Sequence, residues 1–168
     1  TALHTATSKS EIKPLLAAQE EGGSYTTVSD LSTFTDYDFN STRVDFAAGG
    51  LQAVEKAEDD KITMLKNLGF SLNLAPVVDM PDSSDQIMYS RSISDVVDTV
   101  SAYAEYAAKF DQAKGVSVTL KHFPGYGTIP DSANTGTGAV VDNRSADSIR
   151  SKYYQPFKKG AQAGARFF

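Results

Sequence analysis

The run FSLNLAPVVDM at residues 70–80 is apolar almost without interruption, and it decides the fold class of this chain. A second run of the same kind, VSVTLKHF, occupies residues 116–123 and is stopped by a Pro-Gly pair. A third run, PLLAA, lies at residues 14–18. Apolar runs of this length without polar alternation are typical of strands that are buried on both faces of a parallel sheet. We therefore predict three parallel strands at these positions.

Helical patterns fill the intervals between the predicted strands. Apolar residues at near-helical spacing occupy residues 51–68, and Gly69 is a helix stop. A more regular apolar stripe runs through residues 96–107 and stops by Gly115, and residues 92–95, SISD, resemble a capping box at its start. Each interval between strands therefore contains a predicted helix.

A third helix is predicted from about residue 145 to residue 163, kinked or divided at Pro156. Strands that alternate with helices indicate an α/β fold with a parallel sheet, and we interpret it as a TIM-type (β/α)8 barrel whose strand-to-helix loops are long. Three strands and a fourth that begins at residues 166–168 make up about half of such a barrel. We assign residues 1–168 to one barrel domain. We expect it to be incomplete at both ends, since residues 1–4 hold neither an initiator methionine nor a signal peptide.

The composition excludes several functional classes. Of the 168 residues, 40% are hydrophobic and 22% charged, as in a soluble globular domain, and no apolar stretch approaches the roughly 20 residues of a membrane span. The 16 basic and 21 acidic residues give a net charge of −5 without a basic run, which argues against nucleic acid as a partner. Cysteine is absent, which fits either the bacterial cytoplasm or an extracytoplasmic compartment.

Polar loops are expected after the strands, at residues 24–45, 80–94 and 124–143. The unusual polar residues stand where the strands end: Gln-Glu-Glu at residues 19–21, Asp79, and the pair Lys121 and His122. Because the carboxyl ends of parallel strands meet at the edge where barrels carry their active sites, we expect these residues to share a site. Structural alternatives remain open. The two glutamates could be solvated turn residues, Asp79 a helix cap or ion-pair partner, and His122 a satisfied core histidine.

Two segments of the chain resemble a known family. Residues 121–127, KHFPGYG, are similar to the KHFPG(H/Y)G signature of family 3 glycoside hydrolases, in the bacterial β-N-acetylglucosaminidase branch. Residues 73–79, NLAPVVD, resemble a strand of the same family. Three further segments agree in order and spacing, namely EEGG at residues 20–23, YSRS at 89–92 and QPF at 155–157. The resemblance extends over nearly the whole chain, and the pairing of its two main segments is specific.

The resemblance implies a (β/α)8 barrel and retaining hydrolysis of O-glycosyl bonds to β-linked N-acetylhexosamine. The implied partner is a carbohydrate, such as an N-acetylglucosamine-containing glycan or cell-wall fragment, and no metal or organic cofactor is implied. The residues that it places in one pocket are the sugar-binding Arg91, Lys121, His122 and Gln19, with Asp79 as their support. A retaining enzyme needs a carboxylate nucleophile and an acid/base about 5 Å apart. In this branch the nucleophile lies on a later strand, past Phe168, and the acid/base is a histidine in an Asp-(Ser/Thr)-His motif.

The chain departs from the family pattern at three positions. The Asp-(Ser/Thr)-His motif reads DSA at residues 131–133 or NTG at residues 134–136, depending on the alignment, and neither reading has the histidine. Asp131 is then what remains of the catalytic loop. Gln19 replaces an aspartate and Thr27 an arginine that hold sugar hydroxyls in the family. These departures favour an alternative function, in which the chain is a catalytically inactive sugar-binding or scaffold descendant of the fold.

Half a barrel would leave its inner face uncovered. We expect that face to carry Leu72, Leu74, Val118 and Leu120. Burial of such side chains contributes about 1.5–3 kcal/mol each, against a net domain stability of about 5–15 kcal/mol. Residues 1–168 alone are therefore expected to self-associate or to need further residues that cover this face.

Overall fold

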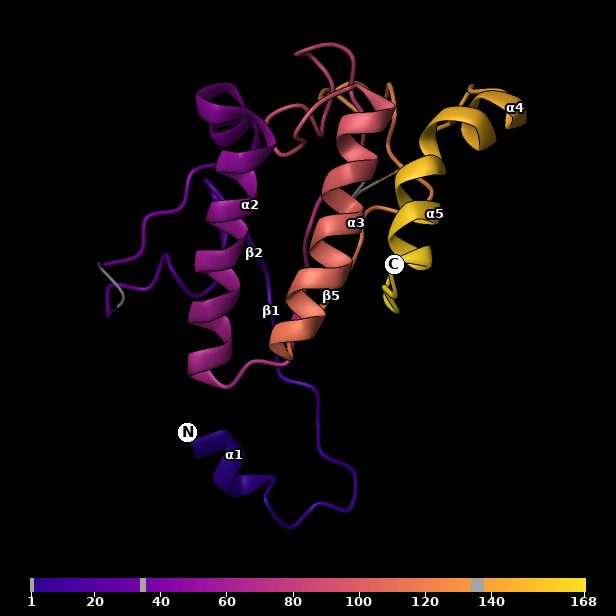
Figure 1. Cartoon of the computed structure of the whole chain (residues 1–168). Helices are drawn as coiled ribbons and strands as arrows, with labels where there is room; N and C mark the ends of the chain where they lie inside the picture. Colours follow the sequence, from indigo (N-terminus) through magenta and orange to yellow (C-terminus); the bar gives the residue numbers. More distant parts are fainter. Residues whose placement is uncertain (1, 34–35, 134–137) are drawn as a thin grey trace.

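A computed structural model of the chain describes residues 2–33, 36–133 and 138–168 (Figure 1). Its centre is a parallel sheet of three short strands in the order β1, β4, β5. These strands are β1 (Ala17–Ala18), β4 (Leu72–Asn73) and β5 (Ser117–Val118). Neighbours in the sheet follow one another along the chain, with a helix in each interval. This is the arrangement of a TIM-barrel-like domain, as the sequence predicts.

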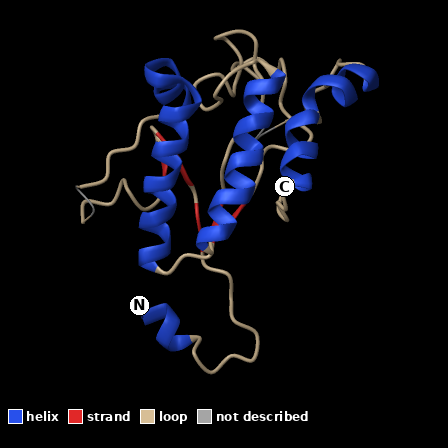
Figure 2. Ribbon diagram, in the orientation of Figure 1, coloured by secondary structure: helices blue, strands red, loops and turns tan. Residues whose placement is uncertain are grey.

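The helices between the strands lie together on one face of the sheet (Figures 1 and 2). α2 (Thr42–Leu68) precedes β4, and α3 (Val97–Lys114) precedes β5. Gly69 and Gly115 end these helices in the left-handed conformation, with φ of 86° and 88°, which confirms both predicted stops. The remaining elements are α1 (Ala2–Ala6), β2 (Glu20–Gly22), β3 (Tyr25–Thr26), α4 (Ala146–Ser148), the π-helix η1 (Ile149–Tyr153) and α5 (Gln155–Gln162).

The main core fills the space between the sheet and the helices. Val118 and Leu120 are buried there, in one cluster with Tyr103 of α3 and Phe157 of α5. A second cluster joins the start of the sheet to α2 and consists of Ala18, Val28, Ile62, Met64, Leu65 and Val116. Both clusters place α2, α3 and α5 on the same side of the strands, so the loops that follow the strands gather at one end of the molecule (Figure 1).

The face of the sheet that points away from the helices does not carry all of the apolar side chains that were predicted for it. Leu74 is 37% exposed, whereas Val118 and Leu120 are buried on the helix side. The prediction that all four leucine and valine side chains share the inner face is therefore wrong. Leu72 pairs with Ser117 instead of Val118, and because side chains alternate along a strand, that register places Val118 on the helix side.

The strands are also shorter than predicted, because the pairing of their backbones becomes irregular. Pro76 has no backbone N–H to donate to the sheet. The Lys121 N–H donates to the Pro76 carbonyl at 3.1 Å, and the Val78 N–H donates to the Lys121 carbonyl at 2.8 Å. The Ala75–Pro76, Lys121–His122 and Phe123–Pro124 peptide bonds are cis. The two chain segments thus stay side by side up to the point where the polar residues begin.

Two helix starts differ from the predictions. α2 begins at Thr42, inside a predicted loop, and Gly49–Gly50 interrupt it with non-helical backbone angles. This break separates the first turns from the apolar pattern by which the helix was predicted. The predicted capping box at residues 92–95 is wrong, because Val96 is the N-cap residue of α3 and receives no side-chain cap. The hydroxyl of Ser94 accepts a hydrogen bond from the Val96 N–H instead.

The third predicted helix is divided, as expected. It consists of α4, η1 and α5, and Pro156 lies in the first turn of α5, where its missing N–H costs no helical hydrogen bond. After α5, Phe167 forms a parallel bridge with Thr119, at the position predicted for a fourth strand.

Candidate functional site

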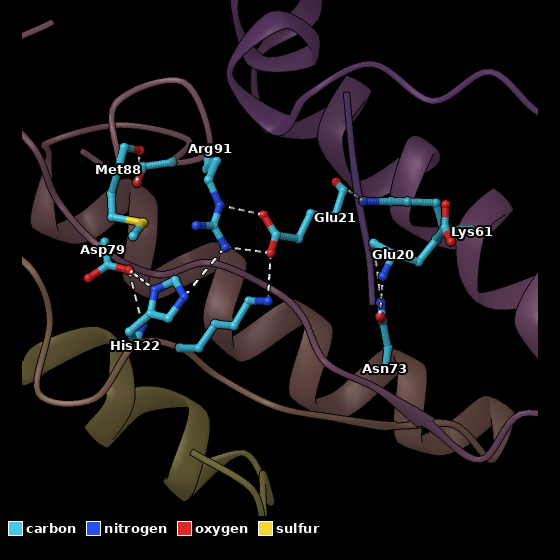
Figure 3. Close-up of polar contacts among 10 residues, drawn as sticks. Glu20, Glu21, Lys61, Asn73, Asp79, Met88, Arg91 and His122 are labelled. Carbon is cyan, nitrogen blue, oxygen red and sulfur yellow. Dashed lines mark hydrogen bonds and ion pairs between the residues drawn. The ribbon is translucent and has the colours of Figure 1, made fainter. Parts of the chain in front are cut away.

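The strand ends bring five polar side chains together, and we refer to them as the Glu21 cluster (Figure 3). Glu21 comes from β2, which follows β1 closely. Asp79 follows β4, and Arg91 lies in the loop before α3. Lys121 and His122 follow β5. In Figure 3 the labelled side chains of Glu21, Arg91, Asp79 and His122 point toward one another.

Glu21 is the centre of the cluster. Its Oε2 accepts a hydrogen bond from Arg91 Nε at 2.9 Å, and its Oε1 accepts one from Arg91 Nη2 at 2.7 Å. Lys121 Nζ lies 2.5 Å from the same Oε1. The Glu21 side chain is 4% exposed and those of Arg91 and Lys121 are each 12% exposed. One buried carboxylate therefore fixes both cations, and the Arg91 contact is the two-pronged geometry that suits a guanidinium.

The electrostatics of the three groups follow from burial and from their mutual contacts. Burial acts to raise the pKa of Glu21, but the hydrogen bonds and charges of Arg91 and Lys121 outweigh it, so that pKa is lowered. Burial acts to lower the pKa of Arg91, but the bonded Glu21 carboxylate reverses this and raises it. For Lys121 burial prevails over the contact with Glu21, and its pKa is lowered. Glu21 is therefore held ionised at neutral pH.

Asp79 orients His122. The Asp79 Oδ2 lies 2.8 Å from His122 Nδ1 and accepts a hydrogen bond from the His122 backbone N–H at 3.0 Å. The Asp79 Oδ1 accepts one from the Tyr126 N–H at 2.6 Å. In a neutral ring, a proton on Nδ1 directed at Asp79 leaves Nε2 as an acceptor, and Nε2 lies 3.4 Å from Arg91 Nη2. Asp79 is thus the contact partner of His122, and no helix begins at it.

The same contacts join the predicted sugar-binding residues. Arg91 contacts both Glu21 and His122, and Lys121 contacts Glu21. The structure therefore brings Arg91, Lys121 and His122 together at the carboxyl end of the sheet, as predicted. Sequence reasoning missed Glu21 as the residue that joins them. The sequence contained a signal for these contacts, because an acidic residue in the EEGG turn was expected at the same sheet edge as the cationic Arg91 and Lys121.

A second layer of polar contacts holds the backbone of Glu21. Lys61 of α2 donates to the Glu21 carbonyl at 3.0 Å (Figure 3). Lys61 also pairs with Glu58 at 2.8 Å. Glu20 points the other way, where its carboxylate accepts a hydrogen bond from the Val28 N–H at 3.1 Å. Both glutamates of the turn are buried, so the alternative that they are solvated turn residues is wrong.

The turn itself depends on Gly22. Its φ is +101°, and a side chain there would overlap the backbone carbonyl of Asn40. The neighbouring Gly23 donates its N–H to the Phe39 carbonyl at 2.7 Å. The chain after β2 is therefore packed directly against the segment before α2, and this close approach aims Glu21 at the cations.

The other predicted residues lie apart from these contacts. Gln19 is half-buried between β1 and β2, and Thr27 is exposed. Asp131 is exposed, and its backbone N–H donates to the Asp85 carbonyl at 2.7 Å. Within the described residues, no recorded contact joins the Asp131 side chain to the Glu21 cluster. The alternative motif at residues 134–136 lies outside the described residues.

In residues 2–33, 36–133 and 138–168, no group of three or more His, Cys, Asp or Glu side chains could hold a metal ion. Within the same ranges, no helix has both the length and the apolar character needed to cross a membrane.

The fold and the position of the cluster past the strand ends define a TIM-barrel-type domain with its candidate site at the usual edge. More specifically, the chain belongs to glycosyl hydrolase family 3, whose N-terminal domain matches residues 2–167.

Several relatives extend this assignment. The chain is 32% identical over 123 residues to a β-hexosaminidase of Stenotrophomonas maltophilia (strain R551-3), an alignment that covers 71% of this chain and 36% of that protein. It resembles the crystal structure of a β-N-acetylhexosaminidase from Beutenbergia cavernae with 28% identity and a TM-score of 0.73, covering 90% of this chain and 45% of the other. A family 3 β-N-acetylglucosaminidase from Paenibacillus has the same fold, with 22% identity and a TM-score of 0.78 over 90% of this chain and 28% of its own.

Proposed function

We propose that the Glu21 cluster binds the terminal β-linked N-acetylhexosamine of a glycan, as the sugar site of a retaining β-N-acetylhexosaminidase. The observation that carries this proposal is the shared carboxylate of Glu21, which holds Arg91 and Lys121 side by side past the strand ends. The relatives named β-hexosaminidase support the choice of sugar.

The cluster supplies the kind of donors that a neutral sugar needs. The guanidinium of Arg91 keeps its Nη1 amino group, and the ammonium of Lys121 keeps further N–H donors, beyond those that Glu21 accepts. Hydroxyl oxygens of a sugar can accept these charge-assisted hydrogen bonds, which are stronger than neutral ones. Because Glu21 already fixes both donors, little side-chain entropy remains to be lost when the sugar binds.

A second candidate function is sugar binding without hydrolysis. It is favoured by Asp131, which is exposed and has no recorded contact with the cluster in the described residues. Ala133 stands at a position where the family carries the proton-transferring histidine. General acid/base catalysis typically contributes about 10²–10⁴-fold to a rate, so the missing histidine predicts slow hydrolysis.

The test combines binding with turnover in the full-length protein. Binding of N-acetylglucosamine is measured by calorimetry, and hydrolysis of an aryl N-acetyl-β-glucosaminide is followed in parallel. Lys121→Met should weaken binding by at least about tenfold, a change of about 1.4 kcal/mol. Lys109→Met is the matched control, because Lys109 is an exposed lysine of α3 that pairs with Glu105 and has no recorded contact with the cluster, and it should change nothing.

The outcomes separate the two candidates. Binding with turnover at the rate of an intact hexosaminidase supports the enzyme, and binding with no turnover supports the sugar-binding protein. A folded protein that binds no N-acetylglucosamine overturns both.

A further inference from the structure

Arg144 is a buried cation outside the Glu21 cluster. It lies in the segment just before α4, and its side chain is 8% exposed. Its Nε donates to Asp142 Oδ1 at 2.9 Å, and its Nη2 donates to Asp142 Oδ2 at 2.7 Å. Burial acts to lower the pKa of Arg144, but the bonded Asp142 carboxylate reverses this and raises it. A pair between residues two apart could form equally well in solvent, so the burial of the guanidinium points to a further partner.

That partner is the backbone of the turn that follows Lys121. Arg144 Nη2 donates to the carbonyl oxygen of Gly125. Gly127 has a φ of +58°, and a side chain on it would overlap the Arg144 guanidinium. The Arg144 Cζ atom also lies 4.1 Å from the centre of the Tyr153 ring, so η1 adds an aromatic surface to this contact. Gly127 thus leaves the space that the guanidinium occupies.

The turn that Arg144 contacts is the one that carries His122. The Gly125 N–H donates to the His122 carbonyl, which closes the turn. The Tyr126 N–H donates to Asp79 Oδ1 at 2.6 Å. The other oxygen of Asp79 lies 2.8 Å from His122 Nδ1 (Figure 3). The rings of His122 and Tyr126 meet edge to face, with their centroids 5.1 Å apart. The position of the imidazole therefore depends on the closed turn, and Arg144 bonds to that turn at the Gly125 carbonyl.

We propose that Arg144 is a positioning residue of the candidate sugar site, which keeps the His122 ring on Asp79 by holding the Gly125 carbonyl. The proposal rests on the proposed sugar-binding function, because its consequence for binding needs a sugar site at the Glu21 cluster. While the ring stays on Asp79, the proton of the neutral ring is on Nδ1, and Nε2 remains an acceptor. A sugar hydroxyl can donate to such an acceptor, so a displaced ring should weaken binding.

The test observes the His122 ring directly. Nitrogen and proton NMR signals of the histidine rings are recorded on the full-length protein at about pH 9, above the ordinary histidine pKa. The signals that are lost in His122→Gln identify this residue. The wild type should show the tautomer with the proton on Nδ1. In Arg144→Ala, the ratio of this tautomer to the Nε2 tautomer should fall by at least about tenfold, and the affinity for N-acetylglucosamine in calorimetry should fall by about as much. Arg150→Ala is the matched control, because Arg150 is an exposed arginine that pairs with Asp147, and it should change neither.

Gly127→Ala is an independent variant that leaves Arg144 in the sequence. Its methyl group would take the space of the guanidinium and should move it off the Gly125 carbonyl, with a similar loss of the Nδ1 tautomer. Gly115→Ala is the matched control for backbone strain. Gly115 also has a positive φ, +88°, but nothing lies within 4 Å of the added methyl group. This control should therefore be destabilised in a similar way and should leave the His122 signals and the sugar affinity unchanged.

The outcomes separate positioning from general destabilisation. An unchanged His122 ring in folded Arg144→Ala or folded Gly127→Ala would overturn the role of Arg144, and so would an equal change in Gly115→Ala. A changed ring in the first two variants alone supports it. Because the ring signals need no sugar, they still test the link between Arg144 and His122 where the wild type binds no N-acetylglucosamine. Failure of the wild type to bind would overturn the proposed function and leave that link to be decided by the ring signals.

Discussion

Replacement of Glu21 by glutamine tests whether one carboxylate holds the candidate site together. The substitution keeps the size of the side chain and removes the charge that Arg91 shares at 2.7 Å and Lys121 at 2.5 Å. Because all three side chains are at most 12% exposed, two largely buried cations would be left beside a neutral amide. Removal of one partner from a buried pair typically costs about 3–5 kcal/mol, a large part of a net stability of about 5–15 kcal/mol.

The free energy of unfolding is measured by urea denaturation of the full-length protein at neutral pH. Glu105→Gln is the matched control, because it makes the same change in the exposed ion pair of Glu105 with Lys109. Exposed pairs contribute little to stability, so the control should unfold like the wild type. Glu21→Gln should lower the unfolding free energy by about 3 kcal/mol or more.

The contribution of the Glu21 ion pairs to the free energy of unfolding should change with pH in a defined direction. The pKa of Glu21 is lowered in the folded protein, so its ion pairs contribute stability that is fully present above the ordinary value of 4.5. That contribution is lost as the pH falls through the lowered pKa. The difference between wild type and Glu21→Gln should therefore be largest at neutral pH and should close in acid. A variant as stable as the Glu105→Gln control, with unchanged binding of N-acetylglucosamine, would refute the reasoning about the cluster.

Three further predictions concern other parts of the chain. Asp111 of α3 is buried, and burial followed by the nearby Glu58 raises its pKa well above the ordinary value. It therefore binds a proton more tightly in the folded state, and wild-type stability should fall by up to about 1.4 kcal/mol per pH unit as the pH rises above the ordinary carboxyl range. Asp111→Asn should remove that slope in urea titrations at several pH values, and a slope that persists would contradict the assignment. Asp131→Ala should leave the affinity for N-acetylglucosamine within about twofold, or 0.4 kcal/mol, of wild type in calorimetry, since its side chain is exposed, and a tenfold loss would place it in the site. Residues 1–168 alone should self-associate or fail to fold in light-scattering and melting experiments, whereas a monomer that melts cooperatively above about 50 °C would show the segment to be self-sufficient.

The site was largely predictable because it depends on the positions where strands end. Apolar runs at residues 70–80 and 116–123 place Asp79, Lys121 and His122 at one sheet edge, whatever the details of the pairing. Glu21 was expected at the same edge, as part of residues 19–21, but its role in joining the two cations was not predicted. Its position at that edge is visible in the sequence, whereas its burial and its contact with Arg91 are not, because they depend on segments far apart in the chain.

The side chains on the inner face of the sheet could not be predicted from the sequence alone either. The alternation of side chains is visible in the sequence of each strand, but the register between two strands is not. A shift of one residue decides whether Val118 points in the same direction as Leu72 or as Asn73, and the structure pairs it with Asn73. The break at Gly49–Gly50 was likewise hidden, because glycine in a helical pattern can be tolerated, can break the helix or can end it.

The contacts of the two carboxylates in the cluster bear on the choice between an enzyme and a binding protein. Glu21 accepts from Arg91 and Lys121, and its lowered pKa keeps it ionised, so it has no proton to donate at neutral pH. Asp79 accepts from the ring and backbone of His122 and from the Tyr126 N–H, which commits both of its oxygens. Retaining hydrolysis needs one carboxylate that is free to attack and a second group that transfers a proton, about 5 Å apart. Glu21 and Asp79 can supply neither role without releasing the side chains that they hold. Hydrolysis at this site would therefore depend on groups other than these two, whereas the proposed sugar binding would depend on them directly. A variant such as Glu21→Gln should lose that binding whether or not the full-length protein is catalytic.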